Sequence, residues 1–235
     1  MTMEKLCYVL WKPAGATGAA FRDALVGPVA SALRARGAER ITALVADEHA
    51  APLAKARITR MEEPIAGMLS CWLPCVDDHP RIEDVLGAHA ARVAGYLVTE
   101  SEVLRNTTHR PARAGERTPG ATLLALLEKP ERLSFDEWIA IWHGRHSPLA
   151  LEIQCTYLYV RNVVQRALTP GAPPWRGLVE EGFPADAVTN PMLWYKAGGD
   201  PSKMRENLGR MVASVREFLD IEKVESHPLS EYVLE

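Results

Sequence analysis

The sequence predicts an α+β fold built from two similar halves, each with the order strand, helix, strand, strand, helix, strand. Two nearly continuous apolar runs, residues 4–11 and 121–128, each end at a Lys-Pro pair. Apolar runs of this length are typical of strands buried on both faces. A helical pattern follows each run, so the two stretches of chain begin in the same way.

Large side chains in the first helix of each half support the same comparison. Phe21 and Leu25 stand in the first copy where Trp138 and Trp142 stand in the second, 117 residues further along the chain. A repeated spacing of this kind indicates internal duplication.

A later pair of segments extends the comparison and sets the expected domains. Residues 96–103 are matched with residues 217–224, 121 positions further on, as a helix end that runs into an alternating strand. We therefore expect one unit over residues 1–106 and a second over residues 121–235. Residues 107–120 between them are rich in Pro, Gly and Arg without periodicity, which is typical of a linker.

Composition bounds the class of protein. The chain has 235 residues, 47% hydrophobic and 24% charged, with a net charge of −3. This is an ordinary globular mix with the length of two domains of roughly 100 to 120 residues. Nucleic acid is not an expected partner, because binding to a phosphate backbone requires a concentrated basic surface. No apolar run approaches the roughly 20 residues that cross a bilayer, and no signal-peptide pattern opens the chain, so we expect a cytoplasmic protein without a membrane partner.

The four cysteines give no sign of a metal site. Cys71 and Cys75 form a C-x3-C pair, but no second pair stands near them to complete a zinc site, and Cys7 and Cys155 are far apart in the chain. We expect four reduced thiols that are buried or half-buried.

In the first half, the second helix carries the clearest signals. Pro80 suits a first helical turn, and an apolar stripe follows it at Ile82, Val85, Leu86, Val93 and Leu97. We place strands near 4–11, 39–47, 65–73 and 99–105, and helices near 18–36 and 80–96.

In the second half, Ser134 and Glu137 form a capping box that starts a helix. We expect this helix to end near Pro148, since the residue before a proline is pushed out of the helical region. A last helix opens at Asp200-Pro201 and buries one face through Met204, Leu208, Met211, Val212, Val215 and Phe218.

Each half is thus a βαββαβ unit, the ferredoxin-like arrangement, in which two helices cover one face of a four-stranded antiparallel sheet. The other face of each sheet remains apolar and needs a partner. We therefore expect two tandem ferredoxin-like units whose sheets pack face to face as an α+β barrel.

The richest stretch for chemistry places Trp138, Trp142, His143 and His146 on one helix. Histidine titrates near neutral pH and suits proton transfer, although a histidine at a helix end is also favoured by the helix dipole alone. Two histidines three residues apart could share a metal, but nothing supplies a third ligand, so no metal is expected.

The strand that follows alternates, so that Tyr157, Tyr159 and Arg161 share one face. This face is equally consistent with a packed interface and with a pocket wall whose phenols donate hydrogen bonds and whose guanidinium pairs with an oxyanion.

These residues resemble the EthD-domain family of the dimeric α+β barrel superfamily. The similarity covers about residues 120–226 and rests on the stretches 133–138, 142–149, 159–162, 173–181 and 195–200. His146 is the best-matched polar residue. The first half departs from the pattern, because Val26 and Val29 stand where His143 and His146 would be, so a histidine-dependent site should exist once, in the second half.

The resemblance implies small-molecule chemistry but leaves its type open. The first hypothesis is a lyase, cyclase or dehydratase without a cofactor, acting on an aromatic or polyketide-like substrate. His146 would transfer the proton with Tyr157 and Arg161 at the developing charge, while Trp138, Trp142, His143 and Tyr159 would bind the substrate. The alternatives are a non-catalytic binding or accessory protein and, from the superfamily alone, a heme-dependent oxidoreductase. The superfamily also leaves a homodimer open.

Overall fold

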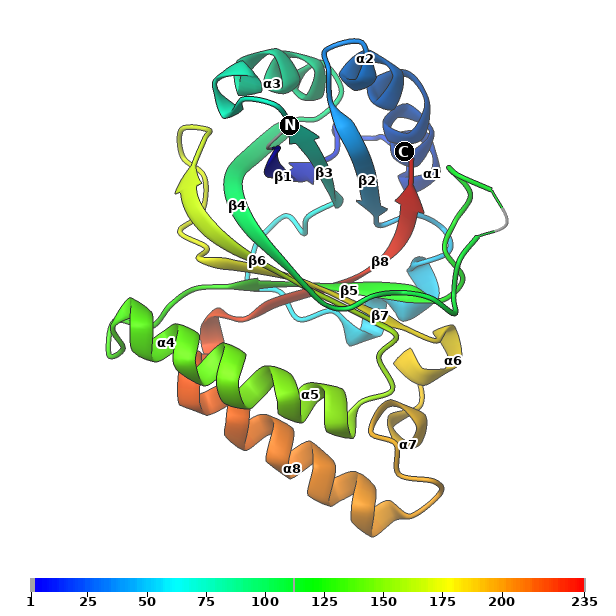
Figure 1. Ribbon diagram of the computed structural model, residues 1–235. Coiled ribbons are helices and arrows are strands. Elements are labelled where there is room, and N and C mark those ends of the chain that lie inside the picture. The colour runs from blue at the N-terminus through cyan, green and yellow to red at the C-terminus, as the bar shows by residue number, and fades with distance from the viewer. Residues whose placement is uncertain (1–2, 112, 235) are drawn as a thin grey trace.

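The computed structural model describes residues 3–111 and 113–234. Over these ranges, eight antiparallel strands close into one barrel in the order β1-β3-β2-β8-β5-β7-β6-β4 (Figure 1). The strands are β1 (Glu4–Trp11), β2 (Glu39–Val45), β3 (Gly67–Leu73), β4 (Arg92–Leu104), β5 (Ala121–Leu127), β6 (Leu158–Ala167), β7 (Gly177–Phe183) and β8 (Glu225–Val233).

The two halves contribute equally to the barrel. The first half supplies the neighbours β4-β1-β3-β2 and the second supplies β8-β5-β7-β6. Counted within its own half, each set runs fourth, first, third and second strand, so the two orders are the same. The halves meet edge to edge, where β2 pairs with β8 and β4 pairs with β6. The α+β barrel is therefore confirmed, and apolar residues on the inner faces of the two halves pack on each other inside it. The pairing of their edges, which joins the two four-stranded sheets into one closed sheet, was not expected. Closure gives the edge strands of each half hydrogen-bond partners, and it also buries the apolar face that its own helices do not cover.

Helices cover the barrel on two opposite sides (Figure 1). On the first side lie α1, η1 and α2, with η3 and α3. On the second lie α4, η4, α5 and α8, while α6 and α7 sit at its edge. Their bounds are α1 (Gly18–Ala24), η1 (Leu25–Val29), α2 (Ala30–Arg34), η2 (Ala51–Ala56), η3 (Val76–Asp78), α3 (His79–Gly87), α4 (Phe135–Ile141), η4 (Trp142–His146), α5 (Ser147–Ile153), α6 (Ala185–Val188), α7 (Pro191–Trp194), α8 (Pro201–Phe218) and η5 (Ile221–Lys223).

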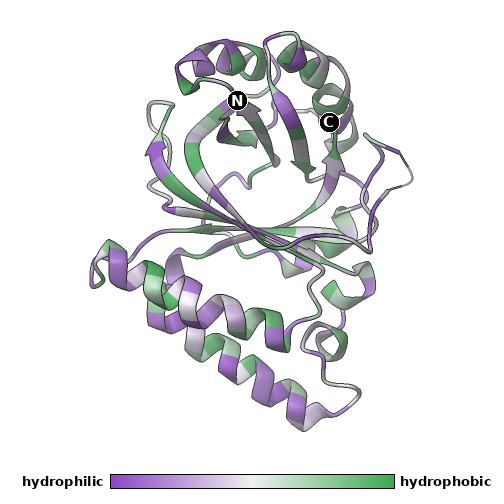
Figure 2. Ribbon diagram, viewed as in Figure 1, coloured by the Kyte–Doolittle hydropathy of each residue, from purple (hydrophilic) through white to green (hydrophobic). Residues whose placement is uncertain are grey.

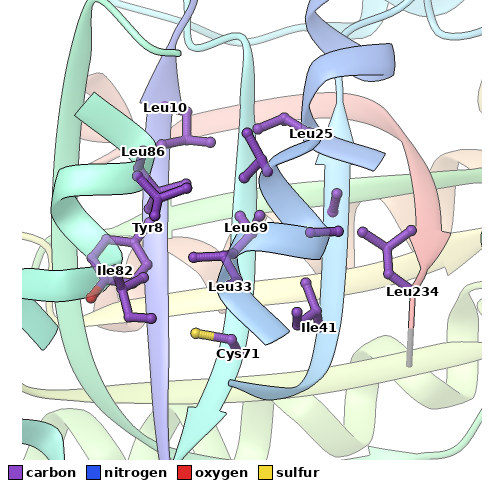
Figure 3. Packing of buried hydrophobic residues seen from close by; sticks show 14 of the residues in the cluster. Tyr8, Leu10, Leu25, Leu33, Ile41, Leu69, Cys71, Ile82, Leu86 and Leu234 are labelled. Atoms are coloured by element: carbon purple, nitrogen blue, oxygen red, sulfur yellow. The ribbon is translucent and has the colours of Figure 1, made fainter. Parts of the chain in front are cut away.

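Hydrophobic residues gather in three main layers, one inside the barrel and one under each group of helices. Under the first helices, Leu25, Leu33 and Ile82 pack on Tyr8 and Leu69 of the sheet (Figure 3). Under the second helices the layer is centred on tryptophans. The helix α8 alternates hydrophobic and hydrophilic bands (Figure 2), as expected for a helix with one face on a sheet.

The expected helix over residues 80–96 is too long. It ends at Gly87, and the chain re-enters the sheet as β4 at Arg92. Val93 and Leu97 do pack against the first helices, but from the strand. A spacing of four residues fits one face of a helix and also one face of a strand. These two positions therefore could not show whether this stretch is a helix or a strand.

The repeat match between residues 96–103 and 217–224 is also wrong. The first segment lies within β4, whereas the second spans the end of α8 and the short η5 helix. The buried face of α8 also differs in part from the predicted one. Leu208 is exposed, and the buried positions are Asn207, Met211, Ser214 and Phe218.

The helix of the second half continues through Pro148. Its five-residue segment η4 is π-helical, and the amide of Ser147 donates to the carbonyl of Trp142, five residues back. The wider turn places Pro148 in the first turn of a new α-helical segment, where its missing N–H costs nothing. Hence His143 and His146 lie in mid-helix and not at its end. The segment η1 of the first half is also π-helical, includes Pro28, and lies 117 residues earlier.

Other expectations are confirmed. The capping box at Ser134 and Glu137 is complete, and Trp138 is fully buried. The four cysteines are free, although Cys75 is exposed and not half-buried. In the described chain, no helix combines the length and apolar character needed to cross a bilayer.

The stretch over residues 107–120 is anchored to the barrel. The amides of Gly115 and Thr118 donate to the carbonyls of Val233 and Glu231, so this segment runs beside the end of β8. Arg110, Arg113 and Thr118 of this segment therefore lie at one end of the barrel, where the cavity described next opens.

Candidate functional site

A cavity of about 870 Å³ opens at one end of the barrel. We call it the barrel-mouth cavity. Its walls come from the first residues of β1, β2 and β6, the last residues of β3, β4 and β8, Glu180 of β7, and the segment before β5. They are Lys5, Arg34, Ala38, Glu39, Arg40, Thr42, Ser70, Trp72, Glu100, Glu102, Arg105, Asn106, Arg110, Pro111, Arg113, Ala114, Thr118, Leu158, Val160, Glu180, Glu231 and Val233.

The rest of the barrel interior is mostly apolar, although a buried pair, His227 and Glu225, also faces inward, with 2.9 Å between Nε2 and Oε2. The indole of Trp11 donates to the carbonyl of Glu63, and the hydroxyl of Tyr96 donates to the carbonyl of Pro173, so two loops hold these rings in place. Trp11 and Tyr96 pack with Leu44, Met68, Leu126, Trp175 and Leu229. The cavity thus has a closed base and one open end.

The floor of the cavity carries a buried cation between two carboxylates. Nζ of Lys5 lies 2.6 Å from Oε2 of Glu100 and 3.3 Å from Oε1 of Glu180. The amide of Asn162 also donates to Oε1 of Glu180, at 2.9 Å. Burial opposes the charge on Lys5, but the negative charges of Glu180 and Glu100 raise its pKa above the ordinary value. Lys5 is therefore a fixed positive charge in a poorly hydrated wall.

Glu231 is the titratable group of the floor. Its side chain is buried, and this burial, with the negative charge of Glu180 nearby, raises its pKa to about 7. A carboxyl with a pKa near neutrality can both take up and release a proton under ordinary conditions.

The rim is exposed and mostly basic. Arg40 has a left-handed backbone, φ 50°, where the register of β2 against β3 shifts between Glu39 and Thr42. This irregularity places its guanidinium 4.4 Å from the ring centroid of Trp72. Arg110 and Arg113 come from the segment beside β8.

The sequence-predicted site lies elsewhere. Among the described residues, the cavity is lined by none of Trp138, Trp142, His143, His146, Tyr157, Tyr159 and Arg161. Trp138 and Trp142 are core residues whose ring centroids are 4.9 Å apart, and their six-membered rings lie over Gly177. A side chain at position 177 would collide with them, so this glycine makes room for the tryptophans.

His146 does not border the cavity, contrary to the expectation. It is 8% exposed and packs under α8, with Nδ1 at 3.0 Å from the hydroxyl of Ser214 and its ring on Phe218. Burial lowers its pKa to about 4, so the imidazole is neutral near pH 7. This position links two helices.

Three of the predicted residues do come together, on the outer face of β6 under the helices. Arg161 donates to the hydroxyl of Ser147, which is 3.3 Å from the hydroxyl of Tyr159. Burial and the charge of Arg161 lower the pKa of His143 to about 4. Burial also raises the pKa of Glu181, on the neighbouring strand, to about 7. We call these five residues the outer cluster.

Within the described chain, the outer cluster leaves polar atoms unsatisfied. Nε2 of His143 and Nε of Arg161 are buried without a hydrogen-bond partner. Tyr157 is not part of the cluster, because its hydroxyl donates to the carbonyl of Pro119 and its ring stacks on His109 at 4.1 Å.

The residues of the barrel-mouth cavity do not fit heme. In the described chain, no histidine, cysteine, methionine or tyrosine lines it, and these are the side chains that hold heme iron. The described residues also form no group of three or more His, Cys, Asp or Glu that could hold a metal ion.

Sequence reasoning missed Lys5, Glu180 and Glu231, the charged floor. A signal existed for Lys5, which lies within an otherwise apolar run, and for Glu180, which directly follows two apolar residues. The mixed polar sequence of β8 gave none for Glu231. A charge that points into a barrel is costly unless it is paired or used. No pattern in the sequence, however, shows that these three strands bring their charges to one place.

Comparisons with known proteins agree on the fold. No protein-family model matches the chain, and no curated protein is significantly similar to it. An anthrone oxidase-like protein of known structure has a TM-score of 0.56 at 10% identity, covering 99% of this chain and 91% of that chain.

Two candidate monooxygenases are similar in the same way. The one from Lactobacillus acidophilus has a TM-score of 0.51 at 6% identity, covering 98% of this chain and 94% of that chain. The one from Fusobacterium nucleatum has a TM-score of 0.51 at 10% identity, with 99% and 92% covered. The chain therefore shares the fold of these proteins, while membership of the EthD family and of its superfamily stays a prediction.

Proposed function

We propose that this protein is an enzyme that carries out acid–base chemistry on a small molecule bound in the barrel-mouth cavity, without a cofactor. One observation carries the proposal: a buried carboxyl, Glu231, whose pKa is raised to about 7, lines a cavity of ligand size. A concave site with a perturbed titratable group is the general signature of an active site.

The proposed step removes a proton from a carbon that is conjugated with a carbonyl group, either directly or through an aromatic ring as in anthrone. The C–H bond breaks, the proton passes to the carboxylate of Glu231, and the electron pair moves onto the carbonyl oxygen. Lys5, held between Glu100 and Glu180, supplies a fixed positive charge for that oxygen. Many lyase, cyclase and dehydratase reactions begin with such a proton removal, and Glu231 then takes the role that the sequence assigned to His146.

The non-catalytic alternative uses the same cavity. In the described chain no histidine reaches this cavity, which favours the binding protein over a histidine-based enzyme. Glu231 provides another proton carrier, and therefore only turnover can decide between the two.

The outer cluster is a second candidate site for the same chemistry. The buried nitrogens without partners, Nε2 of His143 and Nε of Arg161, favour it, because a ligand or water would satisfy them. Glu181, with its raised pKa, would then carry the proton.

The test uses anthrone, whose methylene group is acidic, in deuterated buffer under argon. We expect the protein to accelerate deuterium incorporation at the methylene, measured by mass spectrometry. Glu231→Gln should slow this exchange at least 100-fold, within the usual range for an acid–base group. The exposed control Glu206→Gln should leave the rate unchanged.

The outcomes separate the candidates. If Arg161→Gln abolishes the exchange while Glu231→Gln does not, the chemistry belongs to the outer cluster. Binding of anthrone without any exchange would support the non-catalytic protein. An unchanged rate in both variants would rule out both sites.

We further propose that the two halves are tandem copies of a ferredoxin-like unit. Both have the strand order that places their fourth and first strands together, and both carry a five-residue π-helical segment, η1 and η4, 117 residues apart. A shared irregularity at the same spacing supports duplication more strongly than a shared element order. Superposition of the two halves in an experimental structure, with η1 on η4, tests it.

A further inference from the structure

The rim of the barrel-mouth cavity has more positive than negative charge. Five arginines and two glutamates, Glu39 and Glu102, are its exposed ionisable residues. Arg105 pairs with Glu102, and Arg34 donates to the carbonyl of Leu234. In the part of the chain that the structure describes, Arg40, Arg110 and Arg113 line the cavity without an ion pair. An anion entering this opening therefore meets three cations that form no ion pair with any described residue.

The position of Arg40 is maintained at a conformational cost. A non-glycine residue with φ 50° is uncommon, because its Cβ is crowded in the left-handed region. The left-handed residue in the strand irregularity places the guanidinium carbon 4.4 Å from the centroid of the Trp72 ring. A guanidinium held over an aromatic face still has N–H groups that can bind a carboxylate with two parallel hydrogen bonds.

Between rim and floor, the cavity has an apolar wall. Leu158 and Val160 of β6 face the cavity and are buried, and Trp72 adds a half-buried indole. Beyond this wall lie Lys5 and Glu231 of the floor. The opening is thus basic, the middle apolar, and the base able to exchange a proton.

We propose that the ligand is an amphipathic organic carboxylate: its anionic group binds Arg40, Arg110 and Arg113, and its apolar body lies along Trp72, Leu158 and Val160. This inference rests on the proposed function only for the site, because it names the chemical class that the cavity binds. The carboxylate selects the orientation in which the opposite end of the molecule reaches Glu231.

The experiment compares two probes of the same shape and different charge, anthraquinone-2-carboxylate and anthraquinone-2-carboxamide. Isothermal titration calorimetry of the full chain should show the carboxylate binding about 10-fold more tightly or better, with an affinity that falls as salt is added. Equal affinities, tighter binding of the carboxamide, or no binding of either probe would overturn the proposal.

Arg40→Gly is the sharpest variant, because glycine adopts a left-handed backbone without strain. It removes the guanidinium, and the relief of the left-handed backbone strain offsets the loss of the contact with Trp72. We therefore expect the midpoint of urea denaturation to change little, and this measurement separates a loss of binding from a folding defect. We expect about a 10-fold loss for the carboxylate and little change for the carboxamide. Arg205→Ala, an exposed arginine outside the cavity, should bind both probes as the wild type does. A similar loss in Arg205→Ala, or none in Arg40→Gly, would contradict the assignment.

Failure of this inference and failure of the proposed function are distinguishable. If the carboxylate is selected but Glu231→Gln leaves deuterium exchange unchanged, the cavity binds anions and does not use Glu231. If the exchange depends on Glu231 while both probes bind equally, the site is catalytic and the ligand class is wrong.

Discussion

Glu231 illustrates how one buried carboxyl links function and stability. Its folded-state pKa of about 7 lies above the ordinary value of 4.5, so the folded protein holds this proton more tightly than the unfolded chain does. Below about pH 4.5 both states are protonated and no penalty exists. As the pH rises towards 7 the unfolded state loses its proton first, and the folded state is progressively destabilised relative to it.

Replacing Glu231 by Gln should therefore stabilise the protein in a pH-dependent manner. We expect the free energy of unfolding to rise by about 1 to 3 kcal/mol at pH 8, because one pKa unit corresponds to about 1.4 kcal/mol, and to change little at pH 4.5. Urea denaturation at the two pH values measures this. Glu206→Gln, on the exposed side of α8, serves as the control. A destabilisation of equal size at both pH values would contradict the assignment.

At the scale of elements, the helix that contains η4 stabilises the second half through its tryptophans. Trp138 is fully buried between the helix and Gly177, whereas Phe135, three residues earlier, is 38% exposed. Trp138→Ala should lower the free energy of unfolding by about 3 to 5 kcal/mol, the usual cost of deleting a large buried aromatic. Phe135→Ala should cost much less. Chemical denaturation of both variants tests the pair, and a loss below about 1 kcal/mol for Trp138→Ala would show that the site can collapse around the gap.

Elements with one clear signal could be predicted from the sequence. The apolar strand β1, the capping box at Ser134 and the start of α8 at Asp200 follow from local physics and agree with the structure. The prediction that the helix ends near Pro148 was wrong, because a π-helical turn relieves the steric conflict of the proline. Such a turn is stabilised by packing, which the local sequence does not show. The site was harder still, since Lys5, Glu180 and Glu231 meet only when distant strands close the barrel.

At the scale of the whole molecule, the halves depend on each other through β2 with β8 and β4 with β6. We expect the full chain to unfold in a single transition when circular dichroism and tryptophan fluorescence are followed in urea. Residues 1–106 alone expose the edges of β2 and β4, and free edges pair with other chains. Sedimentation of this fragment should show association. A folded, monomeric fragment would mean that the edges are protected in another way.

The two junctions of the barrel are unequal. In the described chain, β2 and β8 share four register pairs, from Thr42 with Val233 to Val45 with Ser230, whereas β4 and β6 share eight. Amide protons of the shorter junction should exchange with solvent faster than those of the longer one, because opening fewer hydrogen bonds requires less free energy. Glu231 and Thr42 belong to the shorter junction and also line the cavity. Local breathing of this junction would widen the cavity on the side of Glu231, so that the weakest part of the barrel is also a route by which a bulky molecule enters and leaves.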